Sequence, residues 1–216
     1  MSVIDKEKFK CPHCNEIFEA DMFKSVNVSE NKEYRNMLVN GTFFKYKCPK
    51  CGKLFMAVYP LIYTDTENKF SIQYTPREMK EDVIKSIIQN RENLPKDFTI
   101  RVVDATYDLV EKMLILQNRL DDRAIEACKV VIHKAFLKQF GDKRVNHIYF
   151  NFNEKGEMFY DIIFVENEKE MVSRATFDIK LYNQIYHDFR KDFKDDDLIV
   201  DYGYGLGLMA KGNTNK

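Results

Sequence analysis

The 216-residue chain has no net charge, because 34 lysine and arginine residues balance 34 aspartate and glutamate residues. It therefore lacks the overall attraction to polyanions on which general nucleic-acid and membrane-surface binders rely. Its apolar runs are a few residues long, far short of the ~20 residues of a membrane helix. The opening residues MSVIDKEKFK contain no apolar segment typical of a secretory signal. We expect a cytoplasmic protein that does not associate with membranes.

Cysteine is also scarce, yet four of the five cysteines lie in two copies of one pattern. Residues 8–18 read KFKCPHCNEIF, and residues 45–55 read KYKCPKCGKLF. Two Cys-x2-Cys turns separated by a longer segment are the ligand pattern of a four-cysteine zinc ribbon. The sequence predicts one structural Zn²⁺ held by Cys11, Cys14, Cys48 and Cys51.

The residues around the cysteines support this interpretation. Asn15 and Gly52 follow the second cysteine of each pair, and both residue types tolerate the left-handed backbone that such a turn requires. Phe18 and Phe55 lie four residues beyond each second cysteine, where they are expected to shield the metal. His13 is expected to be exposed, because four thiolates already complete a tetrahedron.

Two other uses of the cysteines remain open, a redox pair and iron–sulfur ligation. A redox pair needs a thiolate at a helix N-terminus, whereas strand patterns follow both cysteine pairs. A catalytic zinc fits poorly, because catalytic sites keep one ligand position open.

Hydrophobic periodicity predicts an α+β fold in two parts. Residues 8–20 are expected to form two strands joined by the turn with the first cysteine pair, and residues 23–28 extend this β region. Further strands are expected at about 42–48, 54–65, 69–75 and 98–104, with helices at about 30–40, 77–90, 106–120 and 122–140. The first part, residues 1–140, is expected to be a zinc-ribbon-like antiparallel β module with a helical layer. The second part, residues 141–216, is expected to be a small β-meander (147–152, 158–165 and 170–177) plus a helix (179–193), ending in a loose tail.

The cysteine motifs, YPLIYTDTENKF at 59–70 and IRVVDATYDLVEKMLILQNRLDDRAIEACK at 100–129 together resemble the CpXC family of prokaryotic proteins. The resemblance covers about residues 9–135, so residues 1–140 are expected to form a CpXC-type domain. It implies an intracellular protein of a bacterium or an archaeon, with a bacterial source favoured, and a four-cysteine metal-binding module. It implies no activity, because the family has no established biochemical function.

No catalytic residues are predicted, since no nucleophile, base and oxyanion donor form a recognisable set. We therefore expect a binding or adaptor protein that engages a protein partner or associates with itself. Exposed tyrosines such as Tyr59, Tyr63 and Tyr74 are the candidate contact residues. Cys128 lies on the apolar stripe of its helix and is expected to be a buried small hydrophobe.

Nucleic-acid binding is the alternative function, and cysteine-based redox chemistry is a second alternative. The candidate nucleic-acid contacts are Lys10, Lys45, Lys47, Lys50 and Lys53, which cluster in sequence around the cysteine turns. We favour charge compensation for the doubly negative zinc–thiolate centre over a nucleic-acid contact. Asp121 and Asp122 are expected to cap the helix that follows them, with Arg123 paired nearby.

Overall fold

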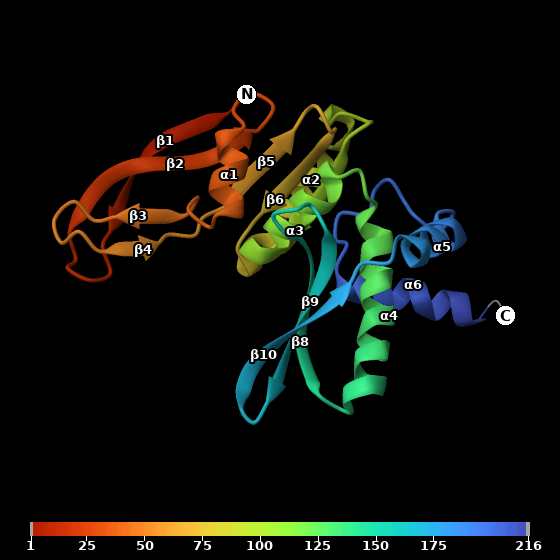
Figure 1. Ribbon diagram of the computed structural model, residues 1–216. Coiled ribbons are helices and arrows are strands. Elements are labelled where there is room, and N and C mark those ends of the chain that lie inside the picture. The colour runs from red at the N-terminus through yellow and green to blue at the C-terminus, as the bar shows by residue number, and fades with distance from the viewer. Residues whose placement is uncertain (1, 215–216) are drawn as a thin grey trace. The chain divides into compact units, whose positions relative to one another are not determined.

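The computed structural model describes residues 2–214, and the chain divides into two compact units, Met1–Val110 and Glu111–Lys216 (Figure 1). The expected α+β class is confirmed, and a separate β-meander is present in the second unit. The division falls inside helix α3 (Thr106–Gln117), ahead of the boundary expected after residue 140. The physical reason is that helix α4 (Asp122–Phe140) packs on elements that follow it.

The first unit combines a five-stranded sheet with a separate two-stranded hairpin. The sheet contains, in spatial order, β1 (Val3–Lys10), β2 (Ile17–Asn27), β5 (Leu61–Asp65), β6 (Phe70–Tyr74) and β7 (Thr99–Val103). The hairpin consists of β3 (Lys45–Lys47) and β4 (Leu54–Met56). The helices are α1 (Glu33–Val39) and α2 (Lys80–Gln89), with single 3-10 turns at Arg77–Met79 and Arg91–Asn93.

The five-stranded sheet is mixed, which corrects the expectation of an antiparallel sheet. Strands β1 and β2 are antiparallel, as are β5 and β6, but β2 pairs with β5 in parallel and β6 pairs with β7 in parallel. Parallel neighbours need a long crossover, and helices lie within both connections, α1 before β5 and α2 before β7.

The core of the first unit contains the tyrosines that were expected at the surface. Tyr59, Tyr63 and Tyr74 are only 7%, 0% and 6% exposed, so that expectation is wrong. Alternate residues of β5 and β6 face the core, and this alternation buries Tyr63 and Tyr74 together with Phe70 and Ile72. These tyrosines therefore offer no surface for self-association.

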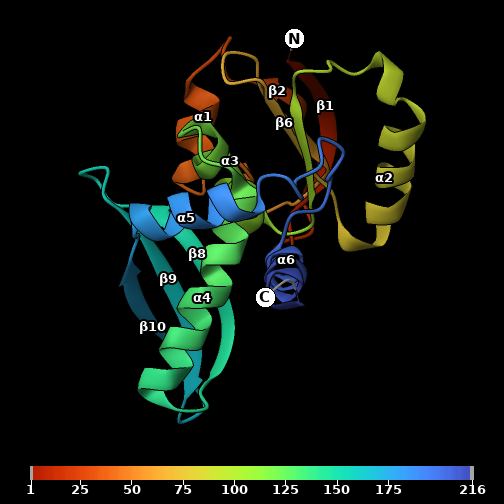
Figure 2. The same cartoon turned by 90° about the vertical axis from the view of Figure 1, so that its right-hand side faces the viewer.

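The second unit is a three-stranded antiparallel meander, in the order β10-β9-β8, covered by helices. Its strands are β8 (Arg144–Phe152), β9 (Met158–Glu166) and β10 (Lys169–Thr176), and its helices are α4, α5 (Ile179–Phe189) and α6 (Tyr202–Thr214). Figure 2 shows α4 running along one face of this sheet. Although α4 has 19 residues, no helix within residues 2–214 is both long and apolar enough to cross a bilayer.

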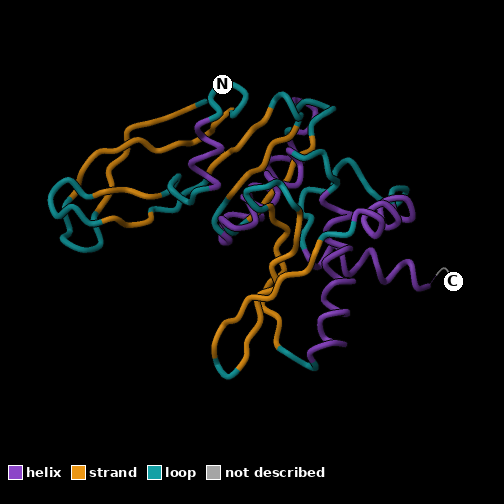
Figure 3. The backbone as a smooth tube through the Cα atoms, in the orientation of Figure 1, coloured by secondary structure: helices purple, strands orange, loops and turns teal. Residues whose placement is uncertain are grey.

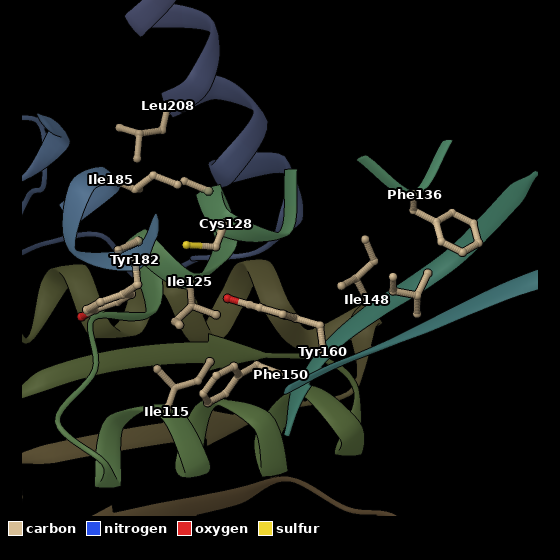
Figure 4. Close-up of a cluster of buried hydrophobic side chains, with 13 residues drawn as sticks. Ile115, Ile125, Cys128, Phe136, Ile148, Phe150, Tyr160, Tyr182, Ile185 and Leu208 are labelled. Carbon is tan, nitrogen blue, oxygen red and sulfur yellow. The ribbon is translucent and has the colours of Figure 1, made fainter. Parts of the chain in front are cut away.

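A continuous apolar cluster joins α4 to the meander. Ile125 and Cys128 on α4 pack with Phe150 and Tyr160 of the sheet (Figure 4). Cys128 is 1% exposed, which confirms its expected role as a small core residue. Burial raises the pKa of its thiol to about 12, so the thiol stays protonated at neutral pH.

Five charged side chains are buried in the second unit, although the sequence pattern did not predict any buried charge there. Each of the five is at most 4% exposed: Glu111, Lys112, Asp122, Glu126 and Lys129. Lys112 Nζ lies 2.7 Å from Glu126 Oε1 and 3.2 Å from Asp122 Oδ2. Lys129 Nζ lies 3.0 Å from the same Glu126 oxygen and 2.8 Å from Glu111. These contacts form one connected ion-pair network between α3 and α4.

The carboxylates expected to cap α4 have different roles. Asp121 is the N-cap, and its Oδ1 accepts a hydrogen bond from the Arg123 amide at 3.0 Å, as expected. The Arg123 guanidinium pairs with the same carboxylate at 2.7 Å. Asp122 instead points into the interior and belongs to the buried network.

The segment expected to be a loose tail forms helix α6 as far as Thr214, and this helix packs against α4; residues 215–216 lie outside the described residues. The contact depends on Gly205, since a Cβ placed there would lie 2.4 Å from the Glu126 carbonyl oxygen. Glycine therefore allows the two helix backbones to approach more closely than any side chain would permit.

Gly205→Ala is expected to destabilise the second unit by roughly 1–3 kcal/mol, because α6 must move away from rigid backbone atoms. Gly207→Ala is the matched control on the same helix. A Cβ at Gly207 meets nothing within 4 Å, so alanine should stabilise the helix by up to about 1 kcal/mol. Urea unfolding followed by far-UV circular dichroism measures the free energy of unfolding of both variants. Equal changes in this free energy would contradict the close approach of α6 to α4 at Gly205.

Candidate metal centre

The two Cys-Pro-x-Cys segments form the tips of two hairpins in the first unit. Cys11 and Cys14 lie in the turn between β1 and β2, and Cys48 and Cys51 lie in the turn between β3 and β4. Figure 3 shows both turns at the same end of the paired hairpins. The packing of the two hairpins thus brings together two cysteine pairs that are more than thirty positions apart in the sequence.

Aromatic side chains between the hairpins hold the two turns together. The rings of Phe9 and Tyr46 stack with their centroids 4.4 Å apart. The rings of Phe18 and Phe55 meet edge to face at 6.1 Å. Phe9 and Tyr46 occupy equivalent positions in the two copies of the repeat, as do Phe18 and Phe55, so each ring contacts its own counterpart across the two hairpins.

The backbones of the two turns follow the same path. The amide of Asn15 donates to the Cys11 carbonyl at 3.0 Å, and the amide of Gly52 donates to the Cys48 carbonyl at the same distance. Asn15 and Gly52 both have positive φ, 60° and 70°, as the sequence predicts. This bend lets amide hydrogens face the sulfurs, and the His13 amide lies 3.4 Å from Cys11 Sγ.

The four sulfurs converge on one point, with every pair of Sγ atoms within 4.8 Å. The Sγ atoms of Cys11 and Cys51 are 3.7 Å apart, and those of Cys14 and Cys48 are 3.6 Å apart. A tetrahedral metal with bonds to sulfur of about 2.3 Å places its ligands about 3.8 Å apart. Disulfide sulfurs are separated by about 2.05 Å, so the four thiols are free and fit a tetrahedral ion.

The thiols do not hold their protons equally. The amide of Cys51, helped by that of Lys50, lowers the pKa of Cys48 to about 7 against the effect of burial. The Glu16 amide favours the thiolate of Cys14, but burial and the three neighbouring sulfurs outweigh it and raise the pKa to about 12. Crowded sulfurs resist simultaneous ionisation, and a cation at their centre removes that resistance.

Within residues 2–214 the four cysteines are the only cluster of cysteine, histidine or carboxylate side chains able to hold a metal ion. His13 is exposed, as expected, and lies outside the cluster. Cys128 belongs to the second unit and takes no part in it. The arrangement can bind one ion through four ligands, which leaves no position for a substrate.

The lysines near the cysteine turns are all exposed: Lys10, Lys45, Lys47, Lys50 and Lys53. They differ in the residues that surround them. Lys50 forms an ion pair with Glu16 at 2.8 Å. On the outer face of β1–β2, Lys8 lies opposite Glu19 and Lys6 lies opposite Asp21. The equivalent face of β3–β4 has a different composition.

On that face Lys45 lies opposite Met56, and Lys47 lies opposite Leu54. Leu54 and Met56 are 63% and 52% exposed. No acidic residue occurs between Glu33 and Asp65 in the sequence. The outer face of β3–β4 is therefore cationic and aliphatic, whereas its counterpart on β1–β2 has balanced charges.

Neither the curated proteins nor the solved structures contain a match to the chain. A model of the CpXC protein family matches residues 9–129, which include both cysteine pairs and all of α3. This match spans more than half of the 216 residues. With its four cysteines gathered into one cluster able to hold a metal ion, the chain belongs to the CpXC family.

Proposed function

We propose that the four cysteines bind a single Zn²⁺ with a structural role. The observation that supports this most directly is the closed set of four sulfurs at tetrahedral spacing, with two Sγ distances of 3.6 and 3.7 Å. Zinc accepts this geometry with thiolate ligands and adds no redox chemistry of its own. Bound there, the ion would cross-link the two hairpins in addition to the aromatic contacts between them.

Redox chemistry of the cysteines is a poorer fit. Redox-active pairs use one thiolate at a helix N-terminus. Here both cysteine pairs lie in turns between strands, and each pair faces the sulfurs of the other. Free thiols in this arrangement would suit a reducing compartment such as the cytoplasm.

We propose further that the metal-held module binds a protein partner through the outer face of β3–β4. Lys45, Lys47, Leu54 and Met56 form this face, and all four are exposed. A partner that suits it presents carboxylates around an aliphatic side chain, so that the lysines gain counter-charges while Leu54 and Met56 leave water.

The same face suits a nucleic acid less well. Single-stranded nucleic acids combine phosphate contacts with bases stacked on aromatic rings. The aromatic residues of this hairpin, Tyr46 and Phe55, face inward and pack against Phe9 and Phe18. The lysines could contact phosphates, but nothing on this face would hold the bases.

Substitutions at Leu54 and Ile17 test the proposal. The two side chains occupy equivalent positions of the repeat and are almost equally exposed, 63% and 62%. Leu54→Glu combined with Met56→Glu should abolish retention of the partner on immobilised protein, since it gives β3–β4 the balanced charge of β1–β2. Ile17→Glu should leave retention unchanged. Mass spectrometry of the retained fraction measures the result, with zinc content checked for each variant.

The proposal predicts that retention resists nuclease treatment and that an acidic, aliphatic segment of the retained protein alone binds the wild type. Nuclease-sensitive retention would instead support the nucleic-acid alternative. Equal loss in the Leu54 and Ile17 variants would show that the face is not specific. Neither of these results bears on the metal, which the zinc content tests separately.

A further inference from the structure

Strand β10 is an open edge of the sheet in the second unit. The sheet runs in the order β10-β9-β8, so among residues 2–214 no strand pairs with the outer side of β10. The strand has eight residues, and all except Ser173 and Ala175 are exposed. Its unpaired backbone amides and carbonyls can accept another strand.

Two other edge strands, β8 and β1, are less suited to such pairing than β10, whose register with its neighbour is regular throughout. Strand β8, the opposite edge, has an irregularity in register between Val145 and His147. Strand β1 carries alternating charges, and ion pairs join Asp5 and Lys6 to its neighbour β2. Irregularities and charges both discourage the addition of a strand. Strand β10 keeps an unbroken register with β9 over all eight residues.

The exposed side chains of β10 include aliphatic residues at its centre. Val172 is 64% exposed and Met171 is 44% exposed. Glu170 and Arg174 flank Val172 at two residues on either side, so all three share one face of the strand. An opposite charge therefore lies on each side of a central valine.

We propose that β10 pairs in antiparallel fashion with β10 of a second copy of this chain, with the twofold axis at Val172. In that register Val172 faces Val172 of the second copy. Glu170 faces Arg174 of the second copy, and the symmetry forms this ion pair twice. Opposite charges and β-branched residues placed directly across an antiparallel pair are the arrangements that stabilise it.

The neighbouring registers lack this complementarity. Moving the centre to Met171 places Val172 opposite Glu170, and moving it to Ser173 places Val172 opposite Arg174. Each shift replaces the ion pairs with contacts between a charge and an aliphatic side chain. Charge complementarity thus selects one register and one occupant, a second copy.

Both charged side chains are already held in place. Arg174 Nε lies 3.0 Å from Asp161 Oδ1, and the guanidinium lies 3.7 Å from the centre of the Phe159 ring. Asn146 donates to Glu170 Oε1 at 2.9 Å. Side chains that are ordered before association lose less conformational entropy when they pair.

A charge-exchange series measured by sedimentation equilibrium tests the pairing. Glu170→Arg should raise the dimer dissociation constant roughly tenfold, because two attractive pairs become repulsive. Glu170→Arg combined with Arg174→Glu should restore it to within about threefold of the wild type. The combined variant does not restore the contacts with Asn146 and Asp161, so recovery can come only from pairing between copies.

Val172→Lys should abolish the dimer, since it places two ammonium groups together on the axis. Lys169→Glu is the control, because residue 169 faces Ala175 of the second copy and changes no charged pair. Thermal unfolding verifies that each variant is folded. A monomeric wild type, a dimer that survives Val172→Lys, or a combined variant without recovery would each overturn the proposal. The metal and the β3–β4 face are untouched by these substitutions.

Discussion

Removal of the metal by a strong chelator is expected to unfold the cysteine hairpins of the first unit, with a loss on the order of 10 kcal/mol of folding free energy. Strands β3 and β4 have three residues each, and an isolated two-stranded hairpin of this length is not stable in water. Elemental analysis before chelation should give one zinc per chain. Circular dichroism and amide proton exchange, recorded before and after chelation, measure the change.

Thiol titration gives the same experiment a second measurement. The metal-bound protein should show no reactive thiols, and the chelated protein should show four, those of Cys11, Cys14, Cys48 and Cys51. Cys128 should react only in denaturant, because it is buried and its pKa is raised to about 12. Reaction of all five thiols on chelation would show that the second unit also depends on the metal.

Substitution of single cysteines provides the matched control. Cys48→Ala should lose the ion, because three ligands cannot close the tetrahedron. Cys128→Ala should retain one zinc per chain and lose only core packing. A protein whose hairpins keep their fold in chelator, with no metal detected beforehand, would refute the structural role.

Lys129→Met is expected to destabilise the second unit by about 3–5 kcal/mol, because it leaves buried carboxylates without their counter-charge. Lys129 Nζ lies 2.8 Å from Glu111 and 3.0 Å from Glu126, and all three side chains are at most 4% exposed. Urea unfolding measured by far-UV circular dichroism tests the size of the effect.

Lys134→Met is the control on the same helix. Lys134 is exposed, so its replacement should change stability by no more than about 0.5 kcal/mol. Combining Lys129→Met with Glu111→Gln should recover part of the loss. The amide of glutamine needs no counter-charge, and its oxygen can still accept from the Phe150 amide, as Glu111 does. Equal effects at Lys129 and Lys134 would show that the network contributes nothing.

The metal turns could be predicted from sequence because their geometry is local. The spacing of each cysteine pair and the residue that follows it determine how the turn bends. Asn15 and Gly52 adopt the expected left-handed backbone for that reason. The repeated phenylalanine next to each turn likewise identified two rings, Phe18 and Phe55, that contact each other between the hairpins.

The buried charges could not be predicted in this way. Glu111 and Lys129 are charged residues on helices, and helical periodicity predicts that charged residues lie on the solvent-exposed face. They are buried only because α3, α4 and β8 meet around them, which no single segment encodes. The one feature of the sequence that could have indicated the network is the occurrence of charges of both signs on α3 and on α4.

The sequence by itself determined the four cysteines of the cluster able to hold a metal, the α+β class and most of the helices and strands, because these depend on residue spacing within short segments. Only the tertiary structure decided which polar and aromatic residues are buried. It turned Tyr63 and Tyr74 toward the core, joined Glu126 to two lysines and packed the glycine-rich C-terminal segment as α6. Burial depends on neighbours that are distant in the chain, and a periodic pattern contains no information about which neighbours those are.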